Sequence, residues 1–200
     1  MGAGLYGPDI GIGCDDGRVS KLGPGSWTLL VCVSIARSDG TLAPRGVSVS
    51  PLRVDGLDAS SLVAHAALQL SRGASSPVLF LDSITIGGFN VVSPPTVYRL
   101  AHVPVVVAYT YRPSFERLAR AASKLPTYRY IEAILRLADS YSEVKTRRGI
   151  LYLIAWGLSP REAAEAAEAF QVHSRKPEPV RVAHYIASAL SALKRPCSRG

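Results

Sequence analysis

The order of strand-like and helix-like segments is the feature of this 200-residue sequence that most constrains its fold. Three apolar segments come first, namely Ile10–Cys14, Ser26–Ile35 and Gly46–Val54. Glycine, proline and aspartate separate them, and such turn residues between short apolar runs predict an antiparallel meander. From Asp58 onward the apolar residues change to helical spacing, which predicts that helices follow the meander.

Two further apolar runs, Val78–Leu81 and Val103–Tyr109, are typical of buried strands that lie between helices. Two helices are expected to start near Asp58 and near Ser93. Further helices are expected over Pro113–Lys124, Tyr128–Leu137, Ser159 to about Phe170, and Arg181–Leu193. A hairpin is also expected within Val144–Ala155. Residues 1–200 are therefore predicted to form a single α/β domain. Its mixed five-stranded sheet has three antiparallel strands, then parallel strands, and helices flank it.

Composition and hydropathy exclude several classes of protein. Hydrophobic residues make up 48% of the chain, which is too high for a disordered protein. The longest apolar runs are shorter than the ~20 residues that cross a bilayer, so we expect no membrane insertion. The start of the chain has neither a basic segment nor an apolar one, so no secretion signal is expected. A cytosolic protein is the resulting expectation.

The chain has three cysteines, at positions that are far apart in sequence: Cys14, Cys32 and Cys197. No Cys-x-x-Cys spacing is present. This argues against a metal knuckle and against a disulfide framework.

The formal net charge of +8 is unevenly distributed. Residues 1–100 contain seven Lys or Arg and seven Asp, whereas residues 101–200 contain sixteen basic and eight acidic residues. Eighteen of the basic residues are arginine, whose planar guanidinium suits phosphate groups. The basic half favours a polyanion as partner, although a solvated basic surface explains the same charge.

Five of the eight aspartates follow the end of a predicted strand: Asp15, Asp16, Asp55, Asp58 and Asp82. In a partly parallel sheet, the carboxyl ends of strands carry ligand sites. Carboxylates that meet there repel each other unless a hard cation such as Mg²⁺ binds them. Asp-Gly at 16–17 and 55–56 is more typical of a turn than of a metal ligand, whereas Asp58 is equally typical of a helix cap. Asp15 and Asp82 directly end apolar strands and are the stronger candidates.

Other candidate residues have competing structural explanations. Gly87 and Gly88 allow a close approach of the backbone to a ligand, or form a tight turn. Phe89 is suited to stack on a base, or to pack in the core. His184 is a lone histidine in a predicted helix, and Arg112 follows a strand where it meets either a phosphate or solvent.

Four motifs add a family resemblance to these observations. They are Gly13–Gly17 (GCDDG), Val54–Ala59 (VDGLDA), Leu81–Val92 (LDSITIGGFNVV) and Pro177–His184 (PEPVRVAH), in this order. Together they resemble an archaeal family of unknown function, some of whose members are described as endonuclease dU. The resemblance covers nearly the whole chain, and the Gly-Gly-Phe-Asn segment is its most specific part. That family is in turn similar to endonuclease V, which has a ribonuclease-H-like fold.

The resemblance to endonuclease V implies a site for Mg²⁺ or Mn²⁺. An aspartate on the first strand, a glutamate at a helix start and an aspartate after the fourth strand bind the metal in those relatives. The matching positions here are Asp15, Asp58 and Asp82, with aspartate in place of glutamate. The Pro-Glu-Pro motif implies that His184 joins the site, as a ligand of a second metal or by orienting water.

The resemblance also implies contacts with nucleic acid. Arg112 and Arg181 are expected to bind phosphate, and Gly87, Gly88, Phe89 and Asn90 to line a base pocket. Two departures from endonuclease V concern the recognition of a lesion. Its Pro-Tyr-Ile-Pro wedge is replaced by Ser50-Pro-Leu-Arg-Val, and its Asp-Gly-His-Gly pocket by Asp82-Ser-Ile-Thr. Lesion specificity is therefore not implied.

The resulting hypothesis is a Mg²⁺- or Mn²⁺-dependent endonuclease with a ribonuclease-H-like α/β fold, acting on deaminated or structured DNA or RNA. The alternative is a nucleic-acid-binding protein of the same fold without cleavage activity. A third hypothesis starts from Gly11–Gly17, which resembles the phosphate-binding hairpin of sugar kinases, but those enzymes need two such domains. The sequence does not specify the oligomeric state.

Overall fold

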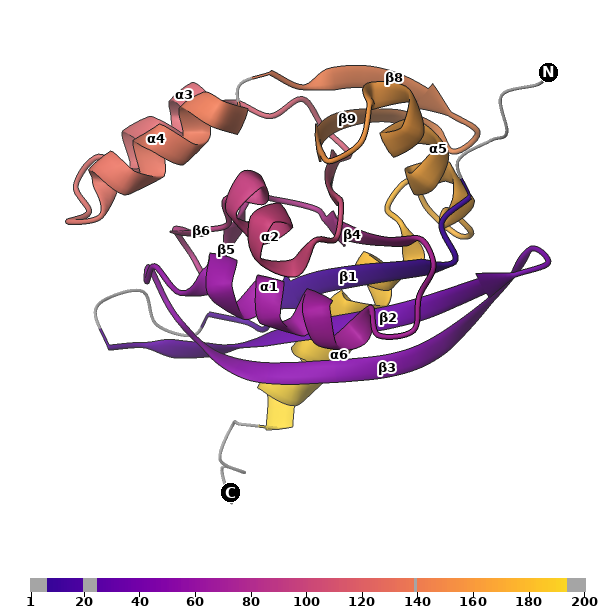
Figure 1. Ribbon diagram of the computed structural model, residues 1–200. Helices are drawn as coiled ribbons and strands as arrows, with labels where there is room; N and C mark the ends of the chain where they lie inside the picture. Colours follow the sequence, from indigo (N-terminus) through magenta and orange to yellow (C-terminus); the bar gives the residue numbers. More distant parts are fainter. Residues whose placement is uncertain (1–6, 20–24, 139, 194–200) are drawn as a thin grey trace.

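The first three strands form the antiparallel meander that the turn residues predicted. In the computed structural model, which describes residues 7–19, 25–138 and 140–193, these strands are β1 (Ile10–Asp16), β2 (Trp27–Ser38) and β3 (Thr41–Arg53). β2 pairs antiparallel with both β1 and β3, so β2 lies between them. Figure 1 shows the long, curved β2 and β3 along one side of the molecule.

The sheet continues from β1 into parallel strands and then ends in a hairpin. β4 (Pro77–Leu81) pairs parallel with β1, and β7 (Val105–Tyr109) pairs parallel with β4. β9 (Gly149–Trp156) and β8 (Ser142–Thr146) then add antiparallel strands beyond β7. The order in this sheet is β3-β2-β1-β4-β7-β9-β8.

The mixed α/β sheet is therefore confirmed, but it has seven strands in the described residues rather than the five that we expected. A hairpin was expected within Val144–Ala155 and is present as β8 and β9, but its sequence contains no information on which strand it would pair with. It pairs with the otherwise unpaired edge of β7, from Val105 to Tyr109. Pairing with β9 satisfies backbone N–H and C=O groups of β7 that would be unpaired at the edge of a five-stranded sheet.

Helices cover both faces of the sheet, because successive residues of its central strands point to opposite faces. On β4, Leu79 and Leu81 belong to one core cluster and Val78 and Phe80 to the other. The first cluster is covered by α1 (Ala59–Leu70), α2 (Pro94–Ala101), α3 (Phe115–Ala122) and α4 (Tyr128–Ala138). The second is covered by α5 (Pro160–Ala169) and α6 (Glu178–Leu193). A short separate hairpin contains β5 (Thr85–Ile86) and β6 (Asn90–Val91).

Helix α6 lies unusually close to β1 because β1 contains Gly13. A Cβ atom added at Gly13 would overlap the backbone of Pro179 and Val180 at the start of α6. Farther along the helix, small residues face the sheet, and Ala183 and Ala187 are fully buried. The packing therefore fixes the depth and the rotation of α6 on the sheet.

The structure contains a disulfide between Cys14 and Cys32, which contradicts our expectation from cysteine spacing. The two residues are direct partners in the β1–β2 register, and both are buried. Residues 18 apart in sequence thus become neighbours through strand pairing, and sequence spacing does not reveal the register. Cys197 lies outside the described residues.

Within the described part of the chain, no helix has the length and apolar character needed to span a bilayer.

We predict that Gly13→Ala destabilises the protein by at least about 3 kcal/mol, because the new methyl group must displace the backbone of α6. The measurement is urea-induced unfolding followed by circular dichroism. Gly46→Ala is the matched control, since there the nearest atom to the new Cβ is Cδ2 of Leu70, a movable side-chain atom, at 3.1 Å. Equal stability losses in the two variants would contradict the proposed role of Gly13.

Candidate active site

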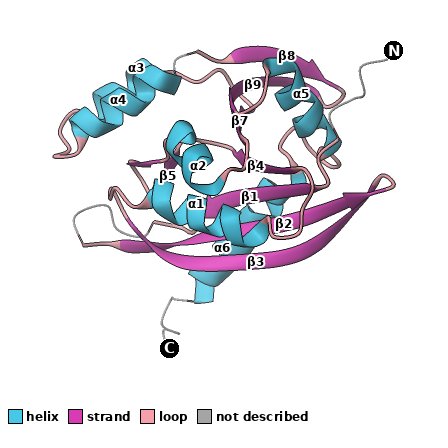
Figure 2. Cartoon of the chain, viewed as in Figure 1, coloured by secondary structure: helices cyan, strands magenta, loops and turns pink. Residues whose placement is uncertain are grey.

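Two carboxylates meet where β1 and β4 end. The parallel register pairs Gly13 with Phe80, so Asp15 and Asp82 are equivalent positions two residues farther along. Asp15 is the penultimate residue of β1, and Asp82 directly follows β4. Figure 2 shows β1 and β4 side by side in the sheet. The buried hydroxyl of Tyr109, at the end of β7, accepts a hydrogen bond of 3.1 Å from the backbone N–H of Ile84. This bond ties the segment after Asp82 to the next strand.

Helix α6 brings His184 to Asp15. Nδ1 of His184 is 2.6 Å from Oδ2 of Asp15, while Oδ1 of Asp15 accepts a 2.8 Å hydrogen bond from the backbone N–H of Asp16. The Asp15 side chain is 11% exposed and that of His184 56% exposed. The carboxylate is therefore held in one orientation, and the imidazole extends from it toward solvent.

A lysine that the sequence analysis did not consider reaches the other carboxylate. Nζ of Lys176, in the segment before α6, donates a 2.6 Å hydrogen bond to Oδ2 of Asp82. The side chains of both residues are partly exposed. This ion pair partly compensates the negative charge that gathers at the strand ends.

The crowding of acidic groups raises their pKa values. Burial raises the pKa of Asp15 above its ordinary value, and the nearby charge of Asp82 raises it further. Burial, and then the charge of Asp15, raise the pKa of Asp16 to about 6. Asp16 nevertheless accepts a 3.0 Å hydrogen bond from the backbone N–H of Gly87. These shifts reflect carboxylates that are desolvated and close together without full compensation by protein cations.

These groups line one pocket of about 440 Å³, which we call the carboxylate pocket. Its lining includes Asp15, Asp16, Asp82, Lys176 and His184. A cluster of three carboxylates at strand ends, an imidazole and an ammonium group is suited to bind a cation and to act on a phosphate ester.

Asp58 does not belong to the described lining of the carboxylate pocket. It occupies the N-cap position of α1, as the cap prediction required, but its side chain makes no capping hydrogen bond. Instead Oδ1 of Asp58 accepts a hydrogen bond from Nδ2 of Asn90, and Oδ1 of Asn90 accepts one of 3.0 Å from the backbone N–H of Ala59. The structure thus brings together Asp15, Asp82 and His184 and places Asp58 elsewhere.

The segment from Gly87 to Asn90 makes internal contacts rather than lining the carboxylate pocket. Gly87 and Gly88 have φ of 59° and 80° and form the tight turn between β5 and β6. Phe89 is half-buried and packs against the core, and its N–H donates to Oδ1 of Asp55 at 2.8 Å. Asn90 is fully buried, and Nδ2 also donates to the carbonyl of Arg53 at 2.9 Å. These contacts hold the 53–58 loop in place.

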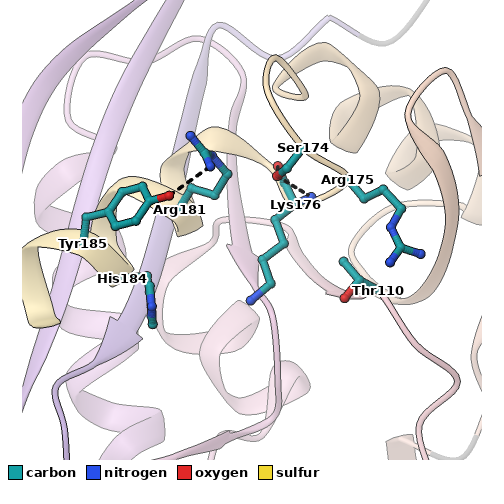
Figure 3. Close-up of a pocket in the computed structure, with 7 residues that line it drawn as sticks. All are labelled: Thr110, Ser174, Arg175, Lys176, Arg181, His184 and Tyr185. Atoms are coloured by element: carbon teal, nitrogen blue, oxygen red, sulfur yellow. Dashed lines mark hydrogen bonds between the residues drawn. The ribbon is translucent and has the colours of Figure 1, made fainter.

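The two candidate arginines lie in different surroundings. Arg112 is exposed, and its Nε donates a 2.6 Å hydrogen bond to the hydroxyl of Tyr141. Arg181 is ion-paired with Glu178 at 3.0 Å and also donates to the hydroxyl of Tyr185 at 3.2 Å. Arg181 and His184 line a second pocket, shown in Figure 3, which shares Lys176 and His184 with the carboxylate pocket.

A model of the endonuclease dU family matches residues 11–191, which is nearly the whole described chain. The chain belongs to the endonuclease dU family. A UPF0215 protein from Aeropyrum pernix is 48% identical over 92% of this chain and 100% of its own length. A solved structure of a protein of unknown function from Archaeoglobus fulgidus is similar with a TM-score of 0.74 and 28% identity, over 92% of this chain and 98% of that one.

This endonuclease dU family member also shares the fold of endonuclease V. The structure of Ciona intestinalis endonuclease V, in complex with a 24mer DNA that contains an inosine followed by a ribo-adenosine, matches with a TM-score of 0.55. The sequence identity is 13%, over 94% of this chain and 87% of that one. The catalytic domain of human endonuclease V matches with a TM-score of 0.53 and 17% identity, over 94% of this chain and 84% of that one. Similarity at this identity establishes the α/β fold.

Asp16 and Lys176 also line the carboxylate pocket, although neither was predicted as a site residue. Asp16 was interpreted as a turn residue because a glycine follows it, and no role was predicted for Lys176. The position of Lys176, directly before Pro177-Glu178, was an available signal, because that motif had already placed His184 at the site.

We predict that Asp16→Asn stabilises the metal-free protein at pH 8 by roughly 1–2 kcal/mol, and that this gain disappears on acidification. The folded protein binds a proton at Asp16 more tightly than the unfolded chain does, because burial raises its pKa from 3.8 to about 6. Wild-type stability therefore falls as the pH rises from 3.8 to about 6, and the full cost persists above that range.

The measurement is the free energy of unfolding of both proteins between pH 4 and pH 8 in buffer containing EDTA. Glu143→Gln, on an exposed position of β8, is the control and is expected to show no such change with pH. A constant difference between Asp16→Asn and wild type across this range would contradict the prediction.

Proposed function

We propose that this protein is a metal-dependent endonuclease that hydrolyses phosphodiester bonds in nucleic acid. The observation that carries the proposal is the meeting of Asp15 and Asp82 with His184 and Lys176 in one open pocket. Membership of the endonuclease dU family and the shared fold of endonuclease V support the same reaction class. The strand order β3-β2-β1-β4-β7, three antiparallel strands followed by two parallel ones, supports the further proposal that the fold is ribonuclease-H-like.

The residues present fit a Mg²⁺ or Mn²⁺ ion held in part by the substrate. Within the described residues, no group of three His, Cys, Asp or Glu side chains is arranged to enclose a metal ion. Mg²⁺ in nucleotide-processing sites keeps several waters and is bound by one or two carboxylates together with substrate phosphates. Asp15 and Asp82 would supply those carboxylates. The charge of Asp82 contributes to the raised pKa of Asp15, and a bound cation would relieve this repulsion. Such a cation supplies Lewis-acid stabilisation of charge on phosphate oxygens.

The other residues of the pocket hold groups in place and manage charge and protons. His184 fixes the orientation of Asp15 through Nδ1, which leaves Nε2 of the imidazole to hold a proton at the attacking water or at the leaving oxygen. In the reaction the water oxygen bonds to phosphorus as the bond to the leaving ester oxygen breaks. Lys176 keeps a positive charge beside Asp82, where a bridging phosphate oxygen would be stabilised.

The proposed substrates are DNA or RNA strands with a deaminated base. The inosine-containing DNA in the complex of Ciona intestinalis endonuclease V supports testing inosine, and membership of the endonuclease dU family supports testing deoxyuridine. The basic second half of the chain supports a polyanionic substrate, and Arg112 and Arg181 are the arginines that we propose to contact its phosphates. Because Phe89 and Asn90 are engaged internally, we propose for them the support of the 53–58 loop next to the pocket.

A non-catalytic nucleic-acid-binding protein is the alternative, and one specific contact favours it. Lys176 already neutralises Asp82, so the carboxylate pocket is partly charge-compensated without a metal. Such a protein would bind oligonucleotides equally well in EDTA and in Mg²⁺.

We predict that Asp15→Asn lowers the rate of incision by at least about a hundredfold, because it removes the carboxylate charge at the centre of the pocket. The measurement uses end-labelled single- and double-stranded oligonucleotides that contain uracil, inosine or normal bases, with Mg²⁺ or Mn²⁺, resolved on denaturing gels. The control is Asp39→Asn, an exposed turn residue at the opposite end of the β1–β2 ladder.

An Asp15→Asn protein that cuts at the wild-type rate would overturn the assignment of the site. Binding by the wild type to every substrate with no metal-dependent incision would favour the non-catalytic alternative.

A further inference from the structure

A second pocket of about 360 Å³ adjoins the carboxylate pocket and has the opposite charge. Its charged lining consists of Arg175, Lys176 and Arg181, with His184 beside them, and the lining contains no acidic residue. Thr110, Ser174 and Tyr185 complete it with three hydroxyl groups. Figure 3 shows these side chains arranged around one opening, with Arg175 and Thr110 on one side and Arg181 and Tyr185 on the other. We call it the basic pocket.

The two pockets are continuous through shared residues. Lys176 and His184 belong to the lining of both. These are also the two residues that contact Asp82 and Asp15. A ligand that spans them would therefore have one group beside the carboxylates and its next group in the basic pocket.

Arg175 carries the charge in the basic pocket that the protein itself compensates least. Arg181 is paired with Glu178, and Lys176 is paired with Asp82. Among the ion pairs of the described residues, none involves Arg175, whose Nη1 donates a long hydrogen bond of 3.5 Å to the carbonyl of Ile150. An exposed guanidinium with a weak neutral partner is suited to an anion that accepts two parallel hydrogen bonds, such as phosphate.

An aromatic ring borders the same pocket. Tyr185 is 58% exposed, and the guanidinium of Arg181 lies 5.3 Å from its ring centroid. Exposed aromatic rings next to cationic groups are the usual platform for an unpaired base. A free inorganic phosphate would use the guanidinium of Arg175 but would gain nothing from this ring.

We propose that the basic pocket binds a nucleotide unit of a single nucleic-acid strand, next to the phosphate that the carboxylate pocket acts on. Its phosphate lies on Arg175 with the hydroxyl of Thr110, and its base lies against Tyr185. The proposal rests on the proposed function for the identity of the strand. The binding itself needs neither metal nor cleavage.

The test is the affinity for a fluorescently labelled single-stranded oligonucleotide, measured by anisotropy in EDTA over a series of salt concentrations. Arg175→Gln is expected to raise the Kd about tenfold, the effect of one lost charge-assisted hydrogen bond, and to lower the salt slope by about 1. Arg45→Gln is the matched control and is expected to bind like wild type. Arg45 is also exposed and donates to a backbone carbonyl, that of Arg72, but it lies at the opposite end of the sheet.

A second pair of variants tests the base. Tyr185→Leu is expected to weaken oligonucleotide binding severalfold, whereas Tyr185→Phe keeps the ring and is expected to bind like wild type. Inorganic phosphate serves as a competitor, and the concentration that displaces the oligonucleotide from wild type gives its affinity for the pocket. Thermal melts confirm that every variant is folded.

Equal affinities of Arg175→Gln and Arg45→Gln would overturn the proposal. Equal affinities of Tyr185→Leu and Tyr185→Phe, together with displacement by inorganic phosphate alone, would identify a free-phosphate site and would also overturn it. If no substrate is incised but Arg175→Gln still weakens binding selectively, the proposed hydrolysis fails and the nucleotide site stands.

Discussion

The close contact between α6 and β1 at Gly13 is the constraint on which both pockets depend. Without a Cβ atom at this position, the start of the helix lies directly on the strand that carries Asp15. The helix then places His184 within hydrogen-bonding distance of Asp15, and the segment before it places Lys176 against Asp82. The same contact positions Arg175 and Arg181 in the neighbouring pocket. One glycine therefore determines how the basic second half of the chain meets the acidic strand ends of the first half.

The resulting distribution of charge is a pair of adjoining pockets rather than a uniform basic surface. The carboxylates at the ends of β1 and β4 concentrate negative charge in a partly buried place. Burial, together with this nearby negative charge, raises the pKa values of Asp15 and Asp16. The cations of the second half compensate this charge incompletely. Lys176 and His184 lie at the boundary and belong to both pockets. This combination would suit a phosphate ester, because Asp15 and Asp82 would hold a cation that stabilises charge on the ester oxygens, while Arg175 and Arg181 would contact the rest of the strand.

Much of the fold was predictable because it depends on local patterns. Turn residues between apolar runs predicted β1, β2 and β3, and runs ending in Asp82 and Tyr109 predicted the parallel strands β4 and β7. The addition of β8 and β9 to the sheet was not predictable, since the pairing edge of β7 is specified by tertiary packing. The disulfide between Cys14 and Cys32 was not predicted for a similar reason. The spacing of two cysteines in the sequence does not reveal which residues of paired strands lie opposite each other.

The candidate site divides in the same way. The sequence by itself determined that Asp15 and Asp82 each end an apolar strand and that His184 belongs to a motif on the last helix, because strand ends and motifs are local properties. Only the tertiary structure decided that Asp58 is bound by Asn90 away from the pocket, and that Asp16 and Lys176 take part in it. Asp58 follows a strand just as Asp82 does, but β2 separates β3 from β1, whereas β4 lies directly beside β1. Which carboxylates converge is set by strand order and helix packing, and these depend on contacts between residues far apart in the chain.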